Sequence, residues 1–212
     1  MLANTTRNSS SFLIPDVREA AGAGTKTGIG FGGALMNQPL SIKDTIAVIN
    51  QMRADGVIGE YAIGGAVAAT FYAEPAQTYD VDVFVALNPT PGQLLLSLEP
   101  IFDYLDRAGH IGRSGEHVVI FDWQVQFLPP DSPLVEEAIS QAVEKNVENV
   151  PVRVFTVEHL AAIALKLGRP KDKLRLLDLV KASEFNGERF DSILLKHGLL
   201  ERWAAFKSQF ID

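Results

Sequence analysis

The sequence predicts a mixed α/β fold, in which a mixed sheet with helices is followed by a helical C-terminal half. Short apolar strand segments alternate with helical segments up to about residue 156, and only helical periodicity follows. The 212 residues are 47% hydrophobic and 21% charged, an ordinary globular composition that can bury a sizeable core. We therefore expect a flexible N-terminal arm over 1–40, an α/β domain over 41–156 and a helical region over 157–212.

The α/β half begins with a helix. Ser41 and Asp44 have the spacing of a capping box, and apolar residues then recur at helical spacing until Gly56 ends the element. Alternating or β-branched segments predict strands over 60–63, 78–87, 117–121, 124–128 and 152–155. The strands over 117–121 and 124–128 are either continuous or hinged. Further helices are expected over 66–73, 93–108 and 134–143.

Four helices are expected in the C-terminal half, over 159–167, 171–183, 189–197 and 201–210. Gly168 and Pro170 stand where a helix-terminating glycine and a helix-initiating proline belong.

The first 40 residues differ from the rest of the chain. They are rich in Ser, Thr and Asn, and the segment Gly28-Ile-Gly-Phe-Gly-Gly33 looks like a phosphate loop. However, no convincing strand precedes the glycines and no amphipathic helix follows them directly. Such a composition is typical of a flexible arm, with a binding loop as the alternative.

Composition excludes several classes of function. The chain has no cysteine, which rules out disulfides, thiolate zinc sites and cysteine nucleophiles. Its formal net charge is −7 and its pI about 5.1, so its overall field does not favour nucleic acid, although a local basic patch is compatible with it. We find neither an apolar run of roughly 20 residues nor a secretory signal. We therefore expect a cytoplasmic protein without a membrane partner.

A glycine pair and a carboxylate pair are the features that indicate chemistry. Gly64-Gly65 is followed by fourteen residues and then by Asp80-Val81-Asp82. Side chains alternate along a strand, so Asp80 and Asp82 point the same way, where two oxygen ligands suit Mg²⁺ and substrate phosphates. The glycines let a phosphate approach the backbone N–H groups of the helix that follows. The alternative is a tight turn beside a solvated acidic strand.

These residues resemble the pattern of the nucleotidyltransferase superfamily, which has the fold of DNA polymerase beta. Ile63-Gly64-Gly65 and Asp80-Val81-Asp82 match that pattern. More narrowly, the chain looks like bacterial nucleotidyltransferase-like proteins related to the AbiEii toxins. The segments that carry this resemblance are Val125-Gln126-Phe127-Leu128-Pro129, Glu158-His159-Leu160 and Gly168-Arg169-Pro170-Lys171-Asp172.

The resemblance implies a Mg²⁺-dependent transfer of an NMP from an NTP to an acceptor hydroxyl of a tRNA, a protein or a small molecule. Asp80 and Asp82 would hold the metal, and Gly64 and Gly65 would cradle the phosphates. A basic cluster would contact the triphosphate or an acceptor nucleic acid, with a solvated helix surface as the alternative, and its members are Lys166, Arg169 and Lys171. The resemblance also suggests a toxin-like role with a cognate antitoxin as partner.

One departure from the family pattern concerns the third carboxylate of active members, whose position matches Gln126 here. A neutral amide adds no negative charge and cannot act as a base. Asp122 lies on the same strand face, but takes this place only if a bulge shifts the register. The alternative function is therefore a catalytically degenerate member that binds a nucleotide or a protein partner without turnover.

The remaining candidates have plainer interpretations. Lys173 and Arg175 are interpreted as solvated surface charges. His159 is the histidine most suited to face a cleft, but a capping or packing role is favoured for it. Trp123 and Trp203 are expected to fill cores rather than stack on a base.

Overall fold

The structure, a computed structural model, describes residues 42–74, 78, 80–87 and 97–211. The predicted arm over 1–40, with its glycine-rich segment, lies outside these residues. The same holds for Ser41 and for the predicted start of a helix at Gln93.

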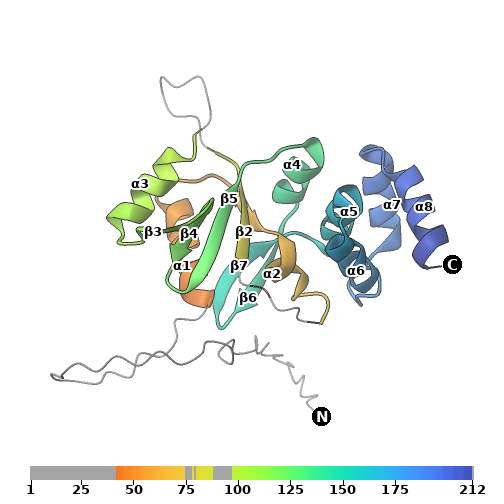
Figure 1. Ribbon diagram of the computed structural model, residues 1–212, viewed down its shortest axis with the longest axis horizontal. Coiled ribbons are helices and arrows are strands. Elements are labelled where there is room, and N and C mark those ends of the chain that lie inside the picture. The colour runs from red at the N-terminus through yellow and green to blue at the C-terminus, as the bar shows by residue number, and fades with distance from the viewer. Residues whose placement is uncertain (1–41, 75–77, 79, 88–96, 212) are drawn as a thin grey trace, which may run out of the picture.

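An α/β half comes first along the chain (Figure 1). Its helices are α1 (Ile42–Ala54), α2 (Gly65–Ala69), α3 (Glu99–Arg107) and α4 (Pro133–Ser140). Its strands are β1 (Tyr61–Ile63), β2 (Asp80–Val85), β3 (Gly112–Ser114), β4 (His117–Ile120), β5 (Trp123–Leu128), β6 (Val143–Val147) and β7 (Val150–Val154).

The helical half follows and lies at one end of the molecule (Figure 1). It consists of α5 (Val157–Leu167), α6 (Pro170–Leu179), α7 (Gly187–Lys196) and α8 (Leu200–Phe210). The predicted mixed α/β architecture with a helical C-terminal half is confirmed. The proposed domain boundary at residue 156 stays a prediction.

The described strands form one seven-stranded mixed sheet in the order β3-β4-β5-β2-β1-β7-β6. At its centre, β2 pairs with β1 in antiparallel and with β5 in parallel orientation. The β2–β5 register is continuous from Asp80 opposite Gln124 to Phe84 opposite Leu128. This register decides which side chains of the two strands share a face.

The two faces of the sheet have different environments. Val81, Val83 and Val85 are fully buried on one face, and α1 and α3 lie on this side (Figure 1). The Thr45 hydroxyl of α1 donates to the Ile120 carbonyl oxygen over 3.2 Å. The alternate residues of β2 face α2 and the helical half. This opposite face carries Asp80 and Asp82, as the period of two predicts.

Two strands were missed by the sequence analysis. β3 is a short, fully exposed edge strand without an apolar residue, so it carries no periodic signal. The helix predicted over 134–143 ends earlier, since α4 ends at Ser140. The strand β6 then begins at Val143, where the sequence analysis still expected helix. The predicted strands over 117–121 and 124–128 form a hairpin, and Phe121 turns the chain with a φ of 55°.

In the helical half, α5 is the central element and contacts α4, α6, α7 and α8. Thr156 caps its N-terminus by accepting from the His159 N–H, and Gly168 ends it with a φ of 66°. As predicted, Pro170 begins α6. Among the described residues, no helix combines the length and the apolar composition needed to cross a membrane.

A carboxylate of α4 is among the groups that join the two halves of the chain. Glu137 of α4 accepts from Lys196 Nζ at 2.6 Å and lies 2.8 Å from His197 Nε2, and both partners belong to the end of α7. This contact helps to fix the helical half against the sheet, and so helps to define the cleft between them.

Candidate functional site

A cavity of about 450 Å³ opens between the Asp80–Asp82 face of the sheet and the helices α5 and α6. We call it the cleft. It brings together nearly all of the residues that the sequence analysis selected for a site. Those that line it are Gly65, Asp80, Asp82, Gln126, Lys166, Arg169 and Lys171.

The acidic wall of the cleft is the carboxylate pair on β2. Asp80 is exposed, whereas Asp82 is partly buried. Burial, followed by the charge of Asp80, raises the pKa of Asp82 above its ordinary value, although Arg175 and Lys171 act in the opposite direction. The pair is therefore a like-charge arrangement that a bound cation would stabilise.

The donor set of this wall suits Mg²⁺, which binds through one or two carboxylates together with substrate phosphates. Within the described residues, no group of three or more His, Asp or Glu side chains is arranged to hold a metal ion. The candidate metal ligands are thus Asp80 and Asp82, with the remaining ligands left to substrate and water.

The two glycines at the start of α2 have separate roles. Gly65 has a φ of +59°, and a Cβ there would lie 1.9 Å from Asp82 Oδ2. Gly64 does not line the cleft. A Cβ on Gly64 would lie 2.5 Å from a ring carbon of Phe84, and the Gly64 N–H donates to the Asp82 carbonyl oxygen over 2.9 Å. Both glycines therefore allow close packing around β2, while their predicted contact with phosphate stays a prediction.

Gln126 occupies the position beside Asp82. The two residues are Cα partners in the parallel β2–β5 pairing, and no bulge interrupts the register. Asp122 instead lies, exposed, in the turn between β4 and β5 and does not line the cleft. Of the two candidates for the third position, only Gln126 lies beside Asp82 and lines the cleft, with its Nε2 donating to Glu116 Oε2 over 3.1 Å.

The basic wall faces the carboxylates from α5, α6 and the turn between them. Lys166 is in the last turn of α5, Arg169 caps the N-terminus of α6, and Lys171 follows in its first turn. Arg175 also lines the cleft, one helical turn further along α6. Its interpretation as a solvated surface charge was wrong, whereas Lys173 does lie away from the cleft, with Nζ 5.2 Å from the Phe210 ring centroid.

A buried carboxylate organises the two arginines. Asp172 is fully buried and accepts from Arg169 Nε at 2.6 Å and from Arg169 Nη2 at 3.3 Å. Arg175 Nη1 lies 3.8 Å from the same carboxylate. The sequence signal for this arrangement is the spacing of three residues on either side of Asp172, which puts all three side chains on one helix face.

Two histidines lie near the cleft, one buried behind it and one in its lining. His159 is fully buried, its Nδ1 lies 2.9 Å from Thr156 Oγ1, and its Nε2 has no hydrogen-bond partner among the described residues. The favoured packing role of His159 is therefore confirmed. His117, which the sequence analysis did not select, lines the cleft instead.

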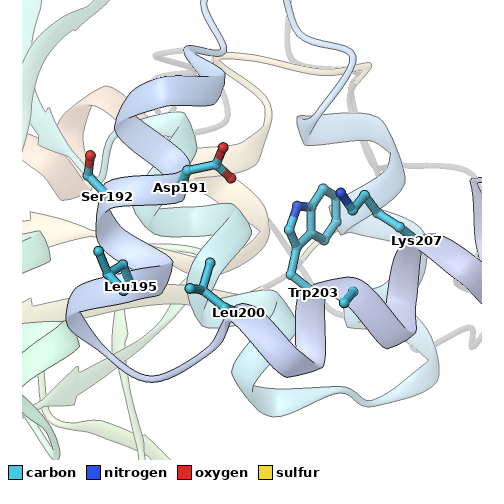
Figure 2. Close-up of a pocket in the computed structure, with 7 residues that line it drawn as sticks. Asp191, Ser192, Leu195, Leu200, Trp203 and Lys207 are labelled. Atoms are coloured by element: carbon cyan, nitrogen blue, oxygen red, sulfur yellow. The ribbon is translucent and has the colours of Figure 1, made fainter.

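A second hollow, of about 460 Å³, lies between α7 and α8 (Figure 2). It is lined by Asp191, Ser192, Leu195, Leu200, Trp203, Ala204 and Lys207. Figure 2 shows Asp191 and Lys207 on different helices, with the Trp203 ring beside the lysine. This hollow has one carboxylate and one lysine, without the paired carboxylates of the cleft, and we assign no chemistry to it.

No protein-family model matches the sequence, and no curated protein matches it. Among solved structures, an antigenic nucleotidyltransferase-like protein from Paracoccidioides brasiliensis is similar, with 15% identity and a TM-score of 0.49 over 78% of this chain and 92% of that chain.

The antibiotic-resistance factor ANT(2'')-Ia is similar in two structures. Its solution structure has 16% identity and a TM-score of 0.43, covering 78% of this chain and 97% of that chain. Its complex with adenylyl-2''-tobramycin has 15% identity and a TM-score of 0.43, with 78% and 98% covered. At these values the likenesses carry no functional inference, so the chemistry of the cleft rests on its own side chains.

Proposed function

We propose that this chain is a Mg²⁺-dependent nucleotidyltransferase that transfers an NMP from an NTP to an acceptor hydroxyl. The observation that carries the proposal is the cleft itself, in which the carboxylates of Asp80 and Asp82 face a basic wall of Lys166, Arg169, Lys171 and Arg175. A metal–triphosphate complex has charges that match both walls.

The roles of the residues follow from their positions. Asp80 and Asp82 hold Mg²⁺, which when bound neutralises phosphate charge and orients the reacting groups. Lys166 and Lys171 contact the triphosphate as mobile point charges, whereas Arg169 is held in a fixed direction by Asp172. Gly65 lets the chain pass close to Asp82, beside the proposed metal site.

The acceptor hydroxyl is proposed to belong to a tRNA, a protein or a small molecule. The resemblance of the sequence to AbiEii-related proteins favours a toxin-like role, and a cognate antitoxin would then be a partner of the chain. Both of these proposals rest on the sequence resemblance alone.

A second candidate function is favoured by Gln126. Because this amide lies beside Asp82, where the family resemblance implies a third carboxylate, a cleft that holds one Mg²⁺–NTP without turnover is also consistent with the geometry. The chain would then be a binding module for a nucleotide or a protein partner.

One experiment separates these functions. The protein is incubated with each α-labelled NTP, Mg²⁺ and cell extract, and Mg²⁺–NTP binding is measured in parallel by calorimetry. We expect binding and transfer by the wild type, and loss of transfer in Asp82→Asn. Asp191→Asn, in the second hollow, is the matched control and should transfer normally. Binding without transfer would favour the binding module, and absence of binding would contradict both functions.

A further inference from the structure

Three neighbouring strands place three side chains in a row across the cleft face. Asp82 on β2 pairs with Gln126 on β5, and β5 in turn pairs with β4, where Val118 is opposite Val125. His117 comes one residue before Val118 and so stands next to Gln126. Adjacent strands are about 4.8 Å apart, which puts the backbone of His117 roughly 10 Å from that of Asp82.

The side chain of His117 shares the cleft with the carboxylates. In β4, Val118 and Ile120 are buried, whereas His117 and Val119 alternate with them on the other face. His117 lines the cleft, and its charge is close enough to lower the pKa of Asp82. The imidazole therefore lies within electrostatic reach of the proposed metal site.

The hydrogen bonding of His117 leaves one ring nitrogen basic. Its Nδ1 lies 3.2 Å from the Ser114 carbonyl oxygen, which can only accept a hydrogen bond. Nδ1 therefore carries the proton of the neutral ring, and Nε2 keeps its lone pair. Nε2 has no hydrogen-bond partner in the part of the chain that the structure describes, and a fixed tautomer with such a nitrogen is what a general base of this type requires.

Gln126 cannot play this part. Its amide has no basic site, and its Nε2 already donates to Glu116 Oε2. A general base for the acceptor hydroxyl would therefore be another side chain of the cleft. We propose that His117 is the general base of this site. The inference rests on the proposed nucleotidyltransferase function. It explains how the chain could catalyse transfer although Gln126 is not a carboxylate.

The proposed step conserves atoms and electrons. The acceptor oxygen attacks the α-phosphorus of the NTP while its proton passes to His117 Nε2. The bond from the α-phosphorus to the oxygen that bridges to the β-phosphorus breaks, and pyrophosphate leaves with the electron pair. The resulting imidazolium then returns its proton to solvent, so the side chain is regenerated for the next turnover.

Apart from the proposed metal ligands Asp80 and Asp82 and the arginine-bound Asp172, two carboxylates compete for the same role. Asp131 also lines the cleft, but it comes three residues after the end of β5, beyond the Asp82–Gln126 pair. Glu116 contacts Gln126 but does not line the cleft. The corresponding variants Asp131→Asn and Glu116→Gln are therefore included in the test.

The test measures binding and transfer separately. In His117→Gln, Mg²⁺–NTP affinity measured by calorimetry should stay within about twofold, whereas transfer should fall at least about 100-fold, the contribution usual for a general base. Adding Gln126→Asp to His117→Gln should restore transfer, because a carboxylate then stands beside Asp82. His110→Gln is the matched control, since His110 packs on Phe121 and does not line the cleft.

A chemical readout does not depend on turnover. Diethyl pyrocarbonate acylates accessible neutral imidazole nitrogens, so mass spectrometry should find His117 modified while the buried His159 is protected. An unmodified His117 would overturn the inference. So would full transfer by His117→Gln, loss of transfer in Asp131→Asn or Glu116→Gln alone, or a wild type that binds NTP but transfers nothing. Absence of NTP binding would instead reject the proposed function.

Discussion

Asp82 and Gly65 lie so close together that no side chain can be placed between them. A Cβ on Gly65 would come within 1.9 Å of Asp82 Oδ2, and Gly65 also has a left-handed φ of +59°. The more buried of the two β2 carboxylates is thus positioned by the turn that connects β1 to α2. The Asp82 carboxylate can therefore keep its position only while residue 65 is a glycine.

Gly65→Ala should displace the Asp82 carboxylate and abolish Mg²⁺–NTP binding measured by calorimetry. The matched control is Gly198→Ala, because Gly198 has a φ of +67° and a Cβ added there would meet no atom within 4 Å. Both variants carry the conformational cost of about 1–2 kcal/mol for a left-handed alanine. Equal NTP affinity in the two variants would contradict a positioning role for Gly65.

Asp82→Asn should raise the free energy of unfolding at neutral pH without Mg²⁺. Folding raises the pKa of Asp82, so the stability that this group contributes is present below its unfolded pKa and is lost as pH rises through its folded pKa. Thermal unfolding at pH 7 should show the gain, at roughly 2–4 °C for each kcal/mol. The difference between variant and wild type should shrink in acid. A variant less stable than wild type at pH 7 would count against this account.

Asp172→Asn should weaken NTP binding about tenfold, or about 1.4 kcal/mol. The buried carboxylate holds Arg169 and lies beside Arg175, and a neutral amide no longer fixes either guanidinium toward the cleft. Calorimetry with Mg²⁺–NTP measures the loss. Asp178→Asn, an exposed position on the same helix, is the control and should bind normally. Unchanged affinity in Asp172→Asn would show that the arginines do not depend on this contact.

His159 predicts an acid-sensitive fold. Burial lowers its pKa to about 4 from an ordinary value near 6.5, so the unfolded chain takes up a proton that the folded chain refuses. Its contribution is fully present above the unfolded pKa and declines as pH falls to about 4, by roughly 3 kcal/mol in total. Urea unfolding of wild type and His159→Asn between pH 7 and 4 tests this. The variant should lose less stability over that range, and parallel curves would contradict the expectation.

The two faces of the central strand β2 could be predicted because they depend only on the order of residues within that strand. Alternation along 80–85 is enough to separate the valines of the core from Asp80 and Asp82, and the structure has the same division. Helix ends at Gly168 and Pro170 were equally local, since a left-handed glycine and an initiating proline need no tertiary partner.

The remaining residues of the cleft could not all be predicted, because their positions depend on strand pairing and on helix packing. Arg175 was interpreted as a solvated charge, since the burial of Asp172 is set by the docking of α6 on α5. The position of His117 depends on the β4–β5 register, which no single strand reveals. The β2–β5 pairing puts Gln126 beside Asp82, while its role in the site stays a prediction. Its contact with Glu116 comes from the turn between β3 and β4, and β3 carries no periodic signal.

The division of the cleft between two halves of the chain has a thermodynamic consequence. The carboxylates belong to the sheet and the arginines to the helical half, while Glu137 joins the halves through Lys196 and His197. A ligand that contacts both walls binds only when the halves are docked, so its binding stabilises the docked arrangement by mass action. At a free ligand concentration one hundred times Kd, binding stabilises the folded, docked protein by about 2.7 kcal/mol. Nucleotide would thereby increase the cooperativity of unfolding, making the sheet and the helices melt as one unit.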